Sequence, residues 1–463
     1  MRIADKTTTA VEMVQEALMK AKEYADYNVF TFVNEKGAIA RAREIDEKIA
    51  RGEKVGRLAG VPYALKDNFL SREGETTASA HILEGLKSPV TATAVERLEA
   101  EGAIMIGRTN MDAFAHGSST ENSYFGPTLN AVDRERVAGG SSGGSAVAVA
   151  LGIVEFATGT DTGGSIRQPA SFNGVYGLKP TYGAVSRYGV VAMASSTDCV
   201  GFFTREAGDL DLLMSIVAGQ DPKDMTTLPD FYGEGDGQAF SSAGLRIGVV
   251  KEFDNDSVAP EIRKALKDKC EALKARGHKI VEVSMPALKY ALAAYYIIVP
   301  AEVASNLSRY DGVRYGFRAE GAKGLDEVYA KTREEGLMPE NKRRIMIGNF
   351  VLSSGFYDAY FLKAARARTL ICQEYEKAFQ ECDVLMTPVA PGPAFKLGEK
   401  SGDPVAMYLE DMMSVSLNLA GVPGLAVPAG KTDAGLPIGL QLVGPRRSDK
   451  ALIQFAKEFA DAK

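Results

Sequence analysis

Apolar residues recur along the chain with two spacings, one typical of amphipathic helices and one typical of short buried strands. Near the N-terminus, the threonines at 7–9 offer a helix N-cap, and apolar residues then follow at helical spacing. These apolar residues are Val11, Val14, Leu18 and Ala21. The last helix is predicted to begin at Ser448. Its apolar face consists of Leu452, Phe455, Ala456 and Phe459.

Two central segments share one pattern, in which a helix ends at a glycine and leads into a short apolar strand. The predicted helices span 93–101 and 261–276, and the strands after them span 103–106 and 279–283. Further short strands are predicted at 245–250, 383–388 and 425–428. Helices that alternate with short apolar strands indicate an α/β fold.

Composition narrows the class of protein. The chain has 54 Lys and Arg against 60 Asp and Glu, a net charge of −6, which argues against a broad basic surface for nucleic acid. The four cysteines show no metal-ligand spacing, so we expect buried thiols in a reducing compartment. We expect no signal peptide and no membrane-spanning stretch, and therefore a cytoplasmic protein.

Two clusters of glycine and serine, at 139–145 and 161–165, are candidates for chemistry. A flexible linker would explain the first, but the small residues at 146–150 that follow it favour a tightly packed helix. A phosphate-binding loop would need a lysine after the glycines, and none is present. A dinucleotide-binding loop would need a preceding strand, and 133–136 is a poor one.

Residues 139–143 also match the GxSxG pattern of a nucleophile elbow, which needs a histidine base later in the chain. The three histidines are His81, His116 and His278, and only His278 follows the serines, in a charged stretch. Serine hydrolases without histidine can use lysine as the base. A lysine with a pKa of about 10.4 is neutral in about one molecule in 2,500 at pH 7. Lys66 directly follows the apolar run 61–65. Making it half neutral at pH 7 requires the charged form to be destabilised by roughly 4.6 kcal/mol, which burial at this position could supply.

These segments resemble the amidase signature family. The resemblance is carried by Lys66-Asp67-Asn68, by the run 139–145 and by the run 161–169, and similar motifs cover nearly the whole chain. It implies that Ser165 is the nucleophile, Lys66 the base and Ser141 the proton relay, with a cis peptide bond before Ser141. It also implies an oxyanion hole formed by Gly163 and Gly164 together with Thr162 and Ser165.

The same resemblance implies one amidase signature domain over 1–463, with a central mixed β-sheet covered by helices on both faces. Within it we distinguish an N-terminal helical segment (1–60), a catalytic core (61–230) and a C-terminal part (346–463). Residues 245–345 are predicted to form an insertion or second lobe. The segment 233–244, rich in glycine, serine and acidic residues, is predicted to be a surface excursion.

Motifs after residue 300 are most similar to the branch of the family that forms the A subunit of tRNA-dependent amidotransferases. That branch implies glutamine as amide donor, with Asp411 holding its α-amino group and Arg344 its α-carboxylate. Arg343 is the near alternative to Arg344, and Tyr296 is a further candidate for the pocket.

The branch also implies partners, namely B and C subunits, with tRNA, ATP and Mg²⁺ bound mainly by the B subunit. For this chain itself we expect no cofactor and no metal. A free-standing amidase of other small carboxamides, and a catalytically silent scaffold or nucleotide-binding protein, remain as alternatives. Three residues depart from the expected pattern: Ala113 for an acidic residue, His116 for a methionine and Ala138 for a proline.

Overall fold

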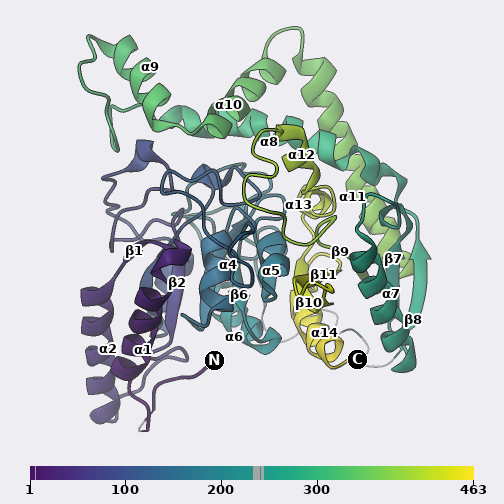
Figure 1. Ribbon diagram of the computed structural model, residues 1–463, viewed down its shortest axis with the longest axis horizontal. Helices are drawn as coiled ribbons and strands as arrows, with labels where there is room; N and C mark the ends of the chain where they lie inside the picture. Colours follow the sequence, from purple (N-terminus) through teal and green to yellow (C-terminus); the bar gives the residue numbers. More distant parts are fainter. Residues whose placement is uncertain (6, 233–239, 241–243, 463) are drawn as a thin grey trace.

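The computed structural model describes residues 1–463 except 6, 233–239, 241–243 and 463 (Figure 1). The predicted surface excursion at 233–244 therefore lies almost entirely outside the described residues. Within the described part, eleven strands form one sheet in the order β1-β3-β2-β4-β6-β5-β10-β11-β9-β7-β8. The strands are β1 Phe30–Val33, β2 Pro62–Lys66, β3 Ile104–Thr109, β4 Phe156–Asp161, β5 Tyr176–Lys179, β6 Cys199–Thr204, β7 Arg246–Val250, β8 Lys279–Val283, β9 Val384–Pro388, β10 Gly424–Lys431 and β11 Pro437–Val443.

The sheet is mixed, as the resemblance predicted. β2 pairs in parallel with both β3 and β4, and β7 pairs in parallel with β8 and β9, whereas the strands between β4 and β9 are antiparallel. The α-helices of the described residues are α1 Ala10–Glu23, α2 Glu35–Ala50, α3 Thr93–Ala100, α4 Gly143–Ala150, α5 Arg167–Asn173, α6 Ala207–Val217, α7 Pro260–Ala275, α8 Ala291–Asn306, α9 Leu325–Gly336, α10 Pro339–Leu352, α11 Lys363–Glu381, α12 Pro404–Leu409, α13 Val415–Ala420 and α14 Asp449–Asp461.

Helices cover both faces of the sheet. Successive residues of a strand point to opposite faces, so a strand with apolar residues throughout needs a packed layer on each side. In β2, Tyr63 and Leu65 belong to the apolar core packed with α3, α6 and α14, whereas Ala64 belongs to the core packed with α1, α2 and α4. Every residue of β2 is buried. A strand buried on both faces reads as a continuous apolar run, which is what 61–65 shows in the sequence.

The predicted terminal helices are confirmed as α1 and α14. Thr9 caps α1, since its hydroxyl accepts from Glu12 N–H while the Glu12 carboxylate accepts from Thr9 N–H. The strands predicted at 103–106, 245–250, 279–283 and 383–388 are present as β3, β7, β8 and β9 within one or two residues at most ends. β10 is longer than predicted, because it pairs with β11 along its whole length.

Residues 245–345 do not form a sheet of their own. Their strands β7 and β8 extend the common sheet beside β9, and α8, α9 and α10 cross the top of the molecule in Figure 1. The stretch Pro286–Arg309, which contains α8, is long and apolar enough to cross a membrane by length and composition alone, contrary to our expectation from the sequence. Most of its apolar 18-residue window, 61%, is buried, and α8 packs against α10 and α11, so this apolar surface belongs to the protein core.

Candidate active site

Lys66 is the last residue of β2 and is fully buried. Its Nζ lies 2.9 Å from Ser141 Oγ and 2.8 Å from Thr160 Oγ1. Thr160 belongs to β4, the strand beside β2, so the sheet itself sets the distance between the amine and this hydroxyl. The lysine side chain is thereby held between a neighbouring strand and the first glycine-serine loop.

The protonation of Lys66 follows from its surroundings. Burial lowers the pKa of the Lys66 amine from 10.5 to about 7, and the buried carboxylates Asp112, Asp161 and Asp198 oppose that shift. Burial raises the pKa of Asp112 and of Asp198 to about 6. A lysine with a pKa near neutrality is a competent proton acceptor at physiological pH.

Ser141 lies in the loop before α4, and the peptide bond between Gly140 and Ser141 is cis. A side chain at Gly140 would collide with the Asp112 carboxylate, whose Oδ2 lies 2.0 Å from the position a Cβ would take. The backbone N–H of Asp112 donates to Ser141 O at 3.2 Å. Glycine is therefore required at 140 because the Asp112 carboxylate approaches so closely. Asp112 contacts this loop through its side chain at Gly140 and through its backbone N–H at Ser141.

Ser165 lies in the second loop, between β4 and α5. The two loops are joined directly, since Ser142 N–H donates to Ser165 O at 3.2 Å. Ser165 is partly exposed, and its hydroxyl makes no hydrogen bond within the described part of the chain. The structure thus brings Lys66 and Ser141 into direct contact and places Ser165 on the neighbouring loop with a free hydroxyl.

The second loop is shaped by the buried carboxylate of Asp161. It accepts hydrogen bonds from Gly164 N–H at 2.8 Å and Ile166 N–H at 3.2 Å, and it pairs with Arg167 at 3.0 Å. Arg167 and the other donors hold the pKa of Asp161 well below its usual range despite burial. The charged pair therefore keeps the backbone of 163–166 in one conformation.

This geometry changes the expected oxyanion hole. The N–H of Gly164 donates to Asp161, so it is not free to stabilise an oxyanion. The N–H groups of Thr162, Gly163 and Ser165 have no acceptor among the described residues. The Thr162 hydroxyl donates to Asp198 at 2.7 Å. The free donors of this loop are thus the N–H groups of 162, 163 and 165.

Replacing Arg167 with leucine is expected to lower the free energy of unfolding by about 3–5 kcal/mol, because Asp161 would remain buried without its countercharge. The midpoint of urea unfolding measures this loss. Arg41→Leu is the control, since it breaks an exposed pair with Glu44 and should cost less than about 1 kcal/mol. Equal midpoints for the two variants would contradict the structural role assigned to Arg167.

The residues predicted to hold the amide donor also lie together. Tyr296 on α8 donates its hydroxyl to Asp411 Oδ2 at 2.7 Å, and Ser118 donates to Asp411 Oδ1 at 2.7 Å. The guanidinium of Arg344 on α10 lies 5.1 Å from the Tyr296 ring centre. Burial raises the pKa of the Asp411 carboxyl to about 7.

Arg344 is 2% exposed, and its Nε donates to Glu340 Oε1 at 2.8 Å. Its two terminal amino groups make no hydrogen bond with any described residue, so they are available for a carboxylate. Arg343, the alternative, is exposed and pairs with Glu340 from the other side. Burial and free donors favour Arg344 over Arg343.

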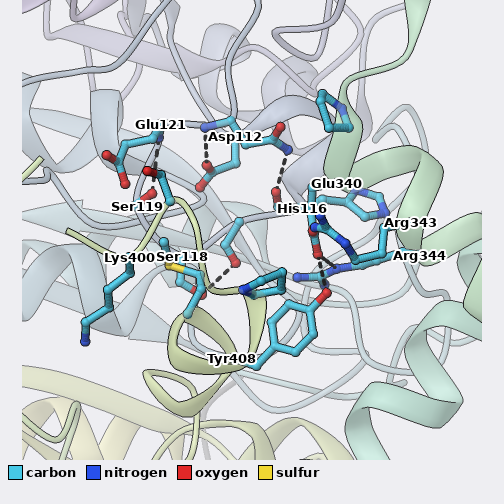
Figure 2. A pocket seen from close by; sticks show the side chains of 16 residues that line it. Asp112, His116, Ser118, Ser119, Glu121, Glu340, Arg343, Arg344, Lys400 and Tyr408 are labelled. Carbon is cyan, nitrogen blue, oxygen red and sulfur yellow. Dashed lines mark hydrogen bonds and ion pairs between the residues drawn. The ribbon is translucent and has the colours of Figure 1, made fainter. Parts of the chain in front are cut away.

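A cavity of about 220 Å³ adjoins this site (Figure 2). Arg344, Glu340 and His116 lie together in one part of its wall, while Glu121 and Lys400 lie in another. Ser118 connects the cavity to Asp411, and Asp112 connects it to the loop of Ser141. Neither Ser141 nor Ser165 lines it.

Metal-binding groups of three or more His, Cys, Asp or Glu side chains are not found among the described residues. The four cysteines are free thiols, three of them buried and Cys372 partly exposed.

Comparison with known proteins identifies the family. A family model described as Amidase matches residues 12–453. The chain belongs to the amidase signature family. It is accordingly an enzyme of that family. The chain is similar to the A subunit of glutamyl-tRNA(Gln) amidotransferase from Anaeromyxobacter dehalogenans, with 49% identity over 98% of this chain and 93% of the relative.

Two solved structures are also similar to this amidase. The A subunit of glutamyl-tRNA(Gln) amidotransferase from Thermotoga maritima is 37% identical, with a TM-score of 0.80 over 98% of this chain and 95% of that chain. A crystal structure of an amidase is 34% identical, with a TM-score of 0.83 over 98% of this chain and 96% of that chain.

Several contacts in this amidase were missed by sequence reasoning. Thr160, Ser118 and Glu340 touch predicted site residues, but each is a common polar residue with no pattern that marks it. Asp112 belongs to Thr109-Asn110-Met111-Asp112, one of the motifs similar to the family, but its contact with the distant loop of Ser141 could not be read from the sequence. The charge of Asp161 could be read from the sequence, but its contact with Gly164 N–H could not.

Proposed function

We propose that this amidase hydrolyses glutamine and supplies ammonia as the A subunit of a tRNA-dependent amidotransferase. The ammonia would convert Glu-tRNA(Gln), or Asp-tRNA(Asn) in the same way, to the corresponding amide-charged tRNA. The observation that carries the proposal is that a buried guanidinium, Arg344, and a buried carboxyl, Asp411, both contact Tyr296. A free amino acid carries both a carboxylate and an ammonium group, and this pair matches the two charges.

The catalytic steps follow from the positions of the side chains. Neutral Lys66 takes the hydroxyl proton of Ser141, and Ser141 in turn takes the hydroxyl proton of Ser165 as Ser165 Oγ attacks the amide carbon. The free N–H groups at 162, 163 and 165 would stabilise the oxyanion, at about 3–4 kcal/mol for each donor. The proton returns through Ser141 to the leaving nitrogen, and the C–N bond breaks to give ammonia and an acyl ester on Ser165.

Water then attacks the ester, and the same lysine and serine accept its proton. The C–O bond to Ser165 breaks, glutamate leaves, and the proton restores the Ser165 hydroxyl. Two steps with moderate barriers thus replace one difficult attack of water on an amide. Lys66 ends the cycle neutral, ready for the next substrate.

The remaining parts of the proposal concern partners. We place ATP, Mg²⁺ and most of the tRNA contact on a B subunit, with a C subunit joining the two, in the cytoplasm. The relatives named as A subunits support this division. The net charge of −6 agrees with it, because an acidic chain is poorly suited to hold tRNA alone.

The alternative is a free-standing amidase of other carboxamides, and the similarity to the 34% identical amidase favours it. Ammonia release from glutamine and from uncharged amides such as propionamide separates the two. For this chain, alone and with copurified B and C subunits, we expect kcat/KM for glutamine to exceed that for propionamide by at least about 100-fold. Faster turnover of propionamide under both conditions would overturn the proposal.

A further inference from the structure

His116 belongs to the wall of the cavity beside Arg344 and carries a buried hydrogen-bond acceptor without a partner among the described residues. The side chain is fully buried, and its Nδ1 lies 2.7 Å from Phe114 O. A carbonyl oxygen only accepts, so Nδ1 carries the proton and Nε2 carries the lone pair. Nε2 has no partner among the described residues, and His116 lines the cavity together with Arg344 and Ser118 (Figure 2).

The cavity favours a ligand that donates hydrogen bonds. Five buried side-chain atoms in the described part of the chain lack a partner, and two of them, His116 Nε2 and Glu121 Oε2, belong to residues that line this cavity. Both are acceptors. A buried acceptor without a partner is unfavourable, and a bound donor would remove that cost. Burial and the nearby Arg344 charge lower the pKa of His116 to about 3, so the imidazole stays neutral near pH 7.

The polar groups of the proposed amino-acid site indicate which donor would bind. Each carboxylate oxygen of Asp411 already accepts one hydrogen bond, from Ser118 and from Tyr296. An ammonium group has three N–H bonds and needs three acceptors. In an amino acid the ammonium and carboxylate share one carbon, so an acceptor for the ammonium must lie close to the arginine that holds the carboxylate. His116 meets this condition, because Arg344 lines the same part of the cavity wall.

We propose that His116 Nε2 accepts a hydrogen bond from the α-ammonium group of the bound amide donor, which makes His116 a specificity-determining residue for α-amino acid amides. The inference rests on the proposed function, since it takes glutamine as the donor. It assigns a role to a side chain at a position where the family resemblance leads one to expect methionine.

The test compares two substrates that differ only in the α-amino group. Glutaramate, the monoamide of glutaric acid, keeps the amide and the distal carboxylate of glutamine and lacks its amino group. For His116→Met we expect kcat/KM for glutamine to fall about 10-fold, mainly through KM, while kcat/KM for glutaramate changes less than about twofold. His278→Met is the matched control, because His278 is also buried with an unpartnered Nδ1 but bonds Glu458 away from the cavity.

Equal losses for the two substrates, or no loss, would overturn the inference while leaving glutamine hydrolysis intact. A wild-type chain that hydrolyses neither substrate would overturn the proposed function and the inference with it. If His116→Met fails to fold, ¹⁵N NMR of the three labelled histidines in the full chain with Ser165→Ala decides the question. The Nε2 resonance of His116 should shift on saturation with glutamine and stay in place with glutaramate. An unchanged resonance with glutamine overturns the inference.

Discussion

Replacing Ser165 with alanine is expected to lower kcat for amide hydrolysis at least about 10⁴-fold, to a residual rate supplied by binding and the oxyanion donors alone. The physical reason is the loss of the hydroxyl oxygen that we propose forms the acyl ester. The Ser165 hydroxyl is free of hydrogen bonds to described residues and partly exposed, so its removal leaves no polar group unsatisfied. Ammonia release from glutamine measures the effect.

Ser171→Ala is the matched control for this experiment. Ser171 lies in α5, the helix that follows Ser165, and its hydroxyl makes no hydrogen bond to any described residue. We expect its activity to match the wild type. Ser165→Ala should also fail to accumulate an acyl-enzyme when intact mass is measured after acid quenching. Ammonia release by Ser165→Ala within tenfold of wild type would assign the nucleophile elsewhere.

Replacing Lys66 with methionine is expected to reduce kcat by about 10³–10⁴-fold, because the serines lose their proton acceptor and the set acts as a unit. The pH dependence is the sharper test. Only neutral Lys66 accepts a proton, and burial places its pKa at about 7, so kcat/KM of the wild type should fall tenfold per unit as pH drops below about 7. Lys66→Met should show a residual rate without that acid limb.

Loss of activity in Lys66→Met should not reflect unfolding. The folded pKa of Lys66 lies below its unfolded value, so this lysine weakens the folded state most at and below about pH 7, and the cost is lost as pH rises to about 10.5. Methionine retains an apolar stem and removes that buried amine. Circular dichroism melting should give a midpoint at pH 7 no lower than that of the wild type. An acid limb that persists unchanged in Lys66→Met would show that another group sets it.

The lowered pKa of Lys66 depends on tertiary contacts, and the sequence predicts only some of them. The apolar run 61–65 predicts that Lys66 ends a buried strand, and burial is the largest cause of its lowered pKa. The contact with Thr160 needs β4 beside β2, a strand pair that local periodicity does not specify. The carboxylates that oppose the shift come from three separate loops or strand ends.

The sequence by itself determined the α/β class, the terminal helices, most strand positions and the family. It did so because periodicity and glycine positions act over a few residues, and because Lys66 and the two glycine-serine loops recur as recognisable motifs. Their roles as base, relay and nucleophile stay predictions until the variants above are measured.

Only the tertiary structure decided which polar groups meet. Tyr296 and Asp411 are 115 residues apart yet share a hydrogen bond, and β7 and β8 join the common sheet instead of forming a separate one. The Asp161 carboxylate accepts a hydrogen bond from the Gly164 N–H, a donor that the family resemblance assigns to the oxyanion hole. His116 Nε2 has no hydrogen-bond partner among the described residues. The reason is that a sequence lists donors and acceptors, whereas folding settles which of them are satisfied by each other and which remain for a ligand.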